Sequence, residues 1–297
     1  MKILHIVHQY APHFVGGTEL YTANLANQQA EAGHEVAIFF PIPEEPQPLQ
    51  AKPSDSLTTY QIAVGKRSGQ QIFRDTLTAS GLIATAFQEA LSAFKPDIVH
   101  IQHLMGLPIK AITSAVAEHG CPLVVTLHDF WWVCANAQRL TNYDGSLCDG
   151  PKVAHLNCGR CGAARAGIPA VSAPMLAPLM AYRNRLLSRL LQQADVVLAA
   201  SNFVAEWHSR KIPLSRPIEI APLGIDTTRF KPRPSHKPSS PLRLLYVGGL
   251  SPQKGVRIVI EAITPLDGVM LTIVGDESKF TDYVSRLKEN SASNVVF

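Results

Sequence analysis

The chain of 297 residues is 46% apolar and 17% charged, and its formal net charge at pH 7 is +4. This balance is typical of a globular protein with one large or two ordinary domains, and it excludes an intrinsically disordered chain. The mild positive charge suits an acidic ligand or an anionic membrane. Without a long Lys/Arg run, it argues against nucleic acid as a partner.

The N-terminal end carries no recognisable targeting segment. Residues 1–7 hold one lysine and a short apolar run, which we interpret as a first β-strand rather than a signal peptide. No apolar stretch reaches the roughly 18 uncharged residues that would span a bilayer. We therefore expect a cytoplasmic protein, in which paired disulfides are disfavoured.

Strands and helices are predicted to alternate along the first two thirds of the chain. In chain order we expect strand 3–7, helix 18–32, strand 35–40, helix 82–94, strand 97–101, helix 109–118, strand 122–127, helix 176–193 and strand 195–199. Residues 41–60 are rich in proline and are interpreted as a surface loop. Repeated strand–helix–strand units predict an α/β fold with a parallel sheet.

A second series of elements follows a proline-rich stretch. Residues 213–241 hold seven prolines, which indicates a linker. Strand 242–247, helix 256–263, strand 269–274 and helix 280–290 come next. A parallel sheet this small has exposed edges and little core, so we interpret the second domain as incomplete. We predict a Rossmann-like domain at 1–215 with a Cys-rich insertion at 130–165, a linker at 216–241 and a truncated domain at 242–297.

Three turns beyond predicted strands carry candidate binding residues. Gly16-Gly17 precede a helix N-terminus, which favours an anion, although a tight turn without a ligand explains them equally well. Lys254, close to Gly248, can contact a phosphate or remain a solvated lysine. His128 lies where ligands of open parallel sheets bind, or it caps loop backbone. Neither G-x-G-x-x-G nor a P-loop signature occurs, which disfavours NAD enzymes and P-loop NTPases.

Four of the five cysteines lie in one segment, namely Cys134, Cys148, Cys158 and Cys161. Four thiolates can close a tetrahedral structural zinc site, which a reducing compartment favours over disulfides. The wide gap between the first two departs from compact zinc ribbons. Half-buried thiols, an iron–sulfur cluster or His155 as a substitute ligand therefore stay open. Cys121 opens a predicted strand and is interpreted as a small apolar residue.

The predicted helix 176–193 combines a series of leucines with Arg183, Arg185 and Arg189. A basic amphipathic helix of this kind can lie on an anionic membrane, so peripheral membrane contact stays open. A helix that packs one side on the core and solvates the other is the simpler interpretation.

The order and spacing of short motifs resemble retaining GT-B glycosyltransferases of family 4 over essentially the whole chain. The matching segments are Met1–Ile6 with Pro12 and Gly16–Glu19, then Ser201–Phe203 and Pro222–Asp226 with Phe230, then Gly248–Leu250, Lys254-Gly255 and Ile273–Asp276. The resemblance implies two Rossmann-like domains around a cleft, the first binding the acceptor and the second the nucleotide sugar. It implies no catalytic metal and a structural role for the cysteine segment.

The resemblance also implies the reaction and the site residues. The protein would move a sugar with anomeric retention from a UDP- or GDP-type donor to an acceptor hydroxyl, in polysaccharide or glycolipid synthesis at the inner face of the membrane. The acceptor would be a glycan or a lipid-linked molecule. His128 would be the catalytic contact to the sugar, and Glu19 and Asp129 would bind the acceptor. The donor-binding residues would be Gly16, Gly17, Gly248, Lys254 and Gly275, with Lys254 on the departing diphosphate.

Two departures from the family pattern matter for activity. Gly249 stands where many members carry an arginine, and Glu277 and Glu289 do not fit the E-x7-E pair of the family. We therefore expect this polypeptide alone to be inactive or nearly so. The alternatives are a related GT-B epimerase or phosphorylase, and a degenerate domain that binds glycan or protein.

Overall fold

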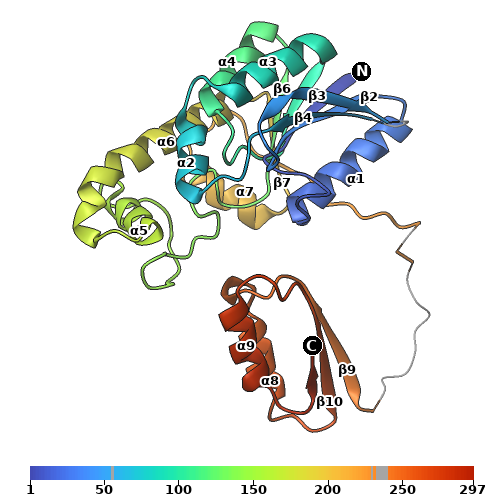
Figure 1. The fold of residues 1–297 in the computed structure, drawn as a ribbon, viewed down its shortest axis with the longest axis vertical. Helices are drawn as coiled ribbons and strands as arrows, with labels where there is room; N and C mark the ends of the chain where they lie inside the picture. Colours follow the sequence, from blue (N-terminus) through green and yellow to red (C-terminus); the bar gives the residue numbers. More distant parts are fainter. Residues whose placement is uncertain (55–56, 229, 232–239) are drawn as a thin grey trace. The chain divides into compact units, whose positions relative to one another are not determined.

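The computed structural model describes residues 1–54, 57–228, 230–231 and 240–297. This part of the chain divides into two compact units, Met1–Thr227 and Thr228–Phe297. Each unit packs helices against its own sheet, whose strands are mainly parallel (Figure 1). The predicted α/β class with two parallel sheets is confirmed. Residues 229 and 232–239 of the predicted linker lie outside the described residues.

The first unit holds an eight-stranded sheet within the described residues, in the order β3-β4-β2-β1-β5-β6-β7-β8. All strand pairs are parallel except β3 with β4. None of the described helices is long and apolar enough to cross a membrane. The elements are β1 (Lys2–Ile6), α1 (Gly17–Glu31), β2 (Glu35–Ile42), β3 (Gln47–Pro53), β4 (Thr58–Ala63), α2 (Gly69–Leu77), α3 (Leu82–Phe94), β5 (Ile98–Ile101), α4 (Ile109–His119), β6 (Leu123–Leu127), α5 (Leu156–Ala166), the 3-10 helix η1 (Ala170–Ser172), α6 (Ala173–Gln193), β7 (Val196–Ala199), α7 (Asn202–Ser209) and β8 (Glu219–Ile220).

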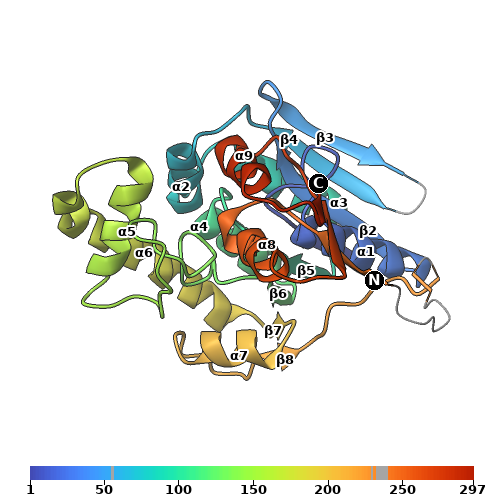
Figure 2. The same ribbon diagram turned by 90° about the horizontal axis from the view of Figure 1, so that it is seen from below.

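Both faces of the central strands are covered. Along β2, Ala37 and Phe39 join the core that includes residues of α3 and α4, whereas Val36, Ile38 and Phe40 face the smaller core that includes α1. A strand buried on both sides needs apolar residues at successive positions, and β2 has them. Figure 2 shows the first unit from a second direction, with the β3–β4 hairpin at one end and α5 and α6 at the other.

The interpretation of residues 41–60 as a loop is wrong, because β3 and much of β4 lie there. Proline cannot donate to a ladder, but β3 is an edge strand that pairs only with β4, so its open side needs no N–H groups. Pro48 and Pro53 therefore lie in an edge strand rather than in a loop. In the same way, β8 pairs with β7 inside the segment that was predicted as linker. The sequence reading also missed α2, α5 and α7.

The second unit has a three-stranded parallel sheet, in the order β11-β10-β9 within the described residues. Its core includes Leu271 and Ile273 on the face that packs against the helices, while Leu245 and Val247 point to the other face and are exposed. The predicted strands and helices of this unit are present with nearly unchanged bounds. The elements are β9 (Leu242–Val247), the 3-10 helix η2 (Pro252–Lys254), α8 (Val256–Ile263), β10 (Val269–Val274), α9 (Thr281–Glu289) and β11 (Val295–Val296).

Candidate active site

Three histidines gather at the carboxyl edge of the sheet in the first unit. His8 lies two residues after β1, His103 two residues after β5, and His128 directly after β6. These three strands are neighbours and parallel, so their ends meet at one edge. The rings of His8 and His103 have centroids 4.3 Å apart, and the ring of Tyr21 on α1 stands edge-on to His128 at 5.1 Å.

Asp129 is held as a carboxylate beside His103. The Nδ1 atom of His103 accepts a hydrogen bond of 3.2 Å from the backbone N–H of Met105, which places the proton of the neutral ring on Nε2. That Nε2 lies 3.4 Å from one oxygen of Asp129, and the other oxygen accepts from the backbone N–H of Trp131 at 2.8 Å. Burial alone would raise the pKa of Asp129, but His103, this N–H and His128 outweigh it and the pKa is lowered.

A chain of hydrogen bonds orients the ring of His128. Its Nε2 lies 2.8 Å from the side-chain oxygen of Gln102, whose amide nitrogen lies 3.1 Å from Nδ1 of His5. Nε2 of His5 in turn lies 2.7 Å from the side-chain oxygen of Gln29 on α1. Amide oxygens only accept, so Nε2 carries the proton in both histidines. Nδ1 of His128 is left as an acceptor, and no hydrogen bond joins it to a described residue.

Burial keeps four of the histidines at and below this edge neutral near pH 7, namely His5, His8, His100 and His128. It lowers the pKa of His5 and His128 to about 4, and it lowers the pKa of His8 and His100 well below the usual value. Repulsion from Arg67 acts in the same direction on His8, and repulsion between protonated rings would oppose the protonation of His8, His100 and His128 further. Neutral imidazoles can donate and accept hydrogen bonds without bringing a charge, which suits the recognition of hydroxyl or carbonyl groups.

The N-terminus of α1 lies at the same edge and carries a buried carboxylate. Glu19 in the first turn is only 3% exposed, and its Oε1 has no hydrogen-bond partner among the described residues. A Cβ on Gly16 would lie 2.5 Å from the other oxygen of Glu19, whereas nothing lies within 4 Å of a Cβ on Gly17. Gly16 therefore makes room for Glu19, which itself occupies the positive end of the helix, and only Gly17 leaves open space there.

The second unit carries the other predicted donor residues at the carboxyl ends of β9 and β10. A Cβ on Gly275 would overlap the carbonyl oxygen of Gly248, so packing within the unit already requires this glycine. Lys254 ends η2, just before α8, and its exposed side chain has no hydrogen bond or ion pair to a described residue. The structure thus places Gly248, Lys254 and Gly275 in one unit and His128, Asp129, Gly16, Gly17 and Glu19 in the other.

The four clustered cysteines lie on α5 and in the loops before it. Cys134 donates to the side-chain oxygen of Asn136 at 2.8 Å, and the sulfur of Cys161 accepts from the backbone N–H of Asn142 at 3.2 Å. Among the described residues, no three His, Cys, Asp or Glu side chains are grouped so that they could hold a metal ion. The zinc site of Cys134, Cys148, Cys158 and Cys161 stays a prediction from the sequence, and in the structure the other three thiols are electrostatic neighbours of Cys158.

Sequence reasoning missed His8, Gln102 and His103. The argument from strand ends that identified His128 applies equally to strands β1 and β5 and would have found all three. Arg67 was missed because α2 was not predicted. Its guanidinium donates to the carbonyl oxygen of Gly106 at 2.7 Å, lies 3.1 Å from Asp75, and contributes to the lowered pKa of His8.

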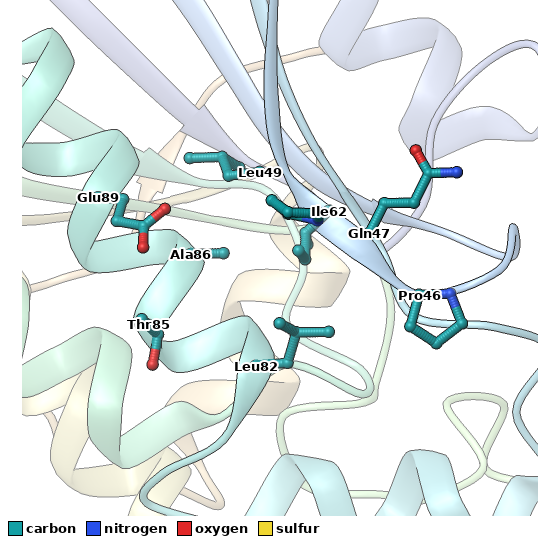
Figure 3. Close-up of a pocket in the computed structure, with 9 residues that line it drawn as sticks. Pro46, Gln47, Leu49, Ile62, Leu82, Thr85, Ala86 and Glu89 are labelled. Carbon is teal, nitrogen blue, oxygen red and sulfur yellow. The ribbon is translucent and has the colours of Figure 1, made fainter.

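A separate cavity of about 340 Å³ lies between the β3–β4 hairpin and α3 (Figure 3). Its walls are mostly apolar, with Leu49, Ile62 and Ala86 on the inside and Glu89 at the side. None of the residues predicted for the site lines this cavity.

Comparisons with known proteins agree on one group. A family profile described as Glycosyltransferase Family 4 matches residues 15–229. The chain is 25% identical over 285 residues to a glycogen synthase of Mycobacterium tuberculosis, covering 93% of this chain and 62% of that protein. It is 33% identical over 81 residues to the putative colanic acid biosynthesis glycosyltransferase WcaL of Escherichia coli, covering 26% of this chain and 19% of WcaL. The chain thus spans less than two thirds of the length of these relatives.

Solved structures share the GT-B fold of this chain. Sucrose-phosphate synthase from Thermosynechococcus elongatus aligns with a TM-score of 0.63 at 15% identity, covering all of this chain and 69% of that one. HepE from Anabaena, in complex with UDP-glucose, aligns with a TM-score of 0.59 at 16% identity, covering all of this chain and 68% of that one.

The neutral histidines predict a loss of stability in mild acid. Their pKa is lower in the folded chain than the value of about 6.5 in an unfolded one, so the unfolded chain binds more protons below that pH. The free energy of unfolding should fall steadily from pH 6.5 towards pH 4, which urea midpoints at several pH values measure. His5→Gln should flatten this dependence, because it removes one of the buried rings whose pKa is lowered. An equal slope in the wild type and His5→Gln would contradict the prediction.

The hydrogen-bond chain predicts a specific role for Gln102. Gln102→Leu should cost about 1–3 kcal/mol, because His5 and His128 each lose a buried partner. Gln102→Glu keeps an acceptor for His128 but adds a negative charge, and should raise the pKa of His128 from about 4. Nitrogen NMR of the imidazoles measures both the proton position and the pKa. A wild-type His128 with its proton on Nδ1 would contradict this arrangement.

Proposed function

Because the chain belongs to glycosyltransferase family 4, whose profile spans residues 15–229, we propose that the protein transfers a sugar from a nucleotide-sugar donor to an acceptor hydroxyl. The family match is the observation that carries this proposal. The neutral, hydrogen-bonding cluster around His128 supports it, because sugar hydroxyls need both donors and acceptors. Family membership agrees with the resemblance seen in the sequence.

In this proposal the acceptor hydroxyl oxygen bonds to the anomeric carbon as the carbon–oxygen bond to the diphosphate breaks, the hydroxyl proton passes to the departing diphosphate, and the configuration is retained. The unprotonated Nδ1 of His128 accepts a hydrogen bond from a hydroxyl of the transferred sugar. Asp129 and Glu19 offer carboxylate oxygens to the acceptor. Lys254 stabilises the negative charge that develops on the leaving diphosphate, and its lack of a partner among the described residues leaves it available for this role.

Gly17 and the backbone at Gly16, Gly248 and Gly275 would approach the donor. We favour a UDP- or GDP-type donor, and the UDP-glucose bound to the structurally similar HepE supports the UDP type. The partial similarity to WcaL supports a role in polysaccharide or glycolipid synthesis, with a glycan or a lipid-linked acceptor. We place this reaction in the cytoplasm, at the inner face of the membrane.

Release of nucleoside diphosphate by the native protein, measured over a panel of sugar nucleotides and acceptors, tests this function. Lys254→Ala should lower kcat/KM roughly a hundredfold, the size of effect that follows loss of one group stabilising a developing anion. Lys288→Ala is the matched control, because Lys288 lies in the same unit but is paired with Glu277 at 2.7 Å. Glycan binding without transfer by the native protein would instead indicate a binding module.

We also propose, from the sequence alone, that a structural zinc ion is held by the four clustered cysteines. Purified protein should then contain about one zinc per chain, the number that four thiolates bind in a tetrahedral site. Cys158→Ser should lose the metal, while Cys121→Ser, outside the segment, should keep it. Metal analysis that finds no zinc, with all five cysteines reacting as thiols, would rule the site out.

A further inference from the structure

The segment from residue 150 to residue 194 contains no aspartate or glutamate. It carries six lysines and arginines and hence a formal charge of +6. Because the whole chain has a formal charge of +4, the residues outside this segment together carry −2. This segment includes α5 and α6, which pack side by side at the end of the first unit away from the β3–β4 hairpin (Figures 1 and 2). Its six cations are Lys152, Arg160, Arg165, Arg183, Arg185 and Arg189.

One face of α6 and of the turn before it exposes apolar side chains. Val171 in η1 is 84% exposed, Met175 is 73% exposed, and Leu179 and Tyr182 are 39% and 47% exposed. Steps of four, four and three residues keep these side chains on the same side of a helix. Arg185 and Arg189 continue the same side after further steps of three and four, and both are exposed. We call these six residues the α6 stripe.

The opposite side of α6 is anchored in the first unit. Met180, Leu187 and Leu190 are buried, and so is Arg183 at 1% exposure. The guanidinium of Arg183 donates to the carbonyl oxygen of Trp131 and lies 4.5 Å from the centre of its ring. Arg183 thus ties α6 to the segment after β6. The α6 stripe is therefore presented by a fixed helix rather than by a loose one.

We propose that the α6 stripe docks the protein on an anionic phospholipid bilayer. Val171, Met175 and Leu179 would enter the boundary between headgroups and acyl chains, with Tyr182 at headgroup level, where its ring and hydroxyl both find partners. The arginines that follow would contact lipid phosphates.

A bilayer fits this surface better than an acidic protein does. The stripe is a single line of side chains along one helix, and none of its residues lines the cavity beside α3. A flat, deformable and negatively charged surface suits such a line, and the absence of carboxylates from residue 150 to residue 194 removes repulsion from it. This docking holds whether or not the chain transfers sugar.

Co-sedimentation with vesicles tests the docking surface. The protein should bind vesicles that contain phosphatidylglycerol, bind pure phosphatidylcholine weakly, and release the anionic vesicles as salt is raised. Arg185→Glu with Arg189→Glu should lower the partition coefficient by roughly tenfold or more, because each basic residue near an anionic surface contributes a factor of about five. Val171→Ser with Met175→Ser should lower it as well.

Arg74→Glu with Arg210→Glu is the control, since it makes the same change in charge at exposed positions outside the stripe. Circular dichroism checks that each variant is folded. No binding of the wild type to anionic vesicles would overturn the proposal, as would an equal loss in the control. So would sedimentation velocity that shows self-association of the wild type lost in the stripe variants, because the stripe would then be a contact between copies.

Discussion

Parallel pairing of β1 with β5 and of β5 with β6 is the constraint on which the candidate site depends. The register places His5 beside His100, and it brings the segments after the three strands to one edge. The stretches His5–His8 and His100–His103 each run from a buried strand position to that edge, and His128 joins them from β6. A shift of one residue in either pairing would turn His5 or Gln102 to the opposite face and break the chain of hydrogen bonds to His128.

Burying polar side chains at this edge destabilises the fold unless each one finds a hydrogen-bond partner. Most of them do. His5, Gln102 and His128 satisfy one another, and His100 lies 2.8 Å from the hydroxyl of Thr126. Within the described residues, two buried atoms at the same edge lack both a hydrogen bond and an ion-pair partner: Nδ1 of His8 and Oε1 of Glu19. Unsatisfied buried atoms are rare in folded proteins, so their presence at this edge is what a site built for a hydrogen-bonding ligand would show.

In the first unit, the candidate site residues and the basic surface lie on different elements. The segments at the strand ends carry histidines and the Asp129 carboxylate, while α5 and α6 carry positive charge without carboxylates. Trp131 links the two regions, because its backbone N–H holds Asp129 and its carbonyl oxygen and ring hold Arg183. The sheet edge around His128 and the helix α6 are therefore tied to the same short segment after β6.

Apolar periodicity by itself determined the α/β class, most strand and helix positions, and His128 as a strand-end residue, because these follow from local pattern. Proline content misled the reading of residues 41–60, because only sheet order shows that β3 is an edge strand. Tertiary structure alone decided that Gly16 makes room for Glu19, that Gly275 packs on Gly248, and that Arg183 is buried. Each of these depends on contacts between residues distant in the chain or on opposite sides of a turn, which no local pattern records.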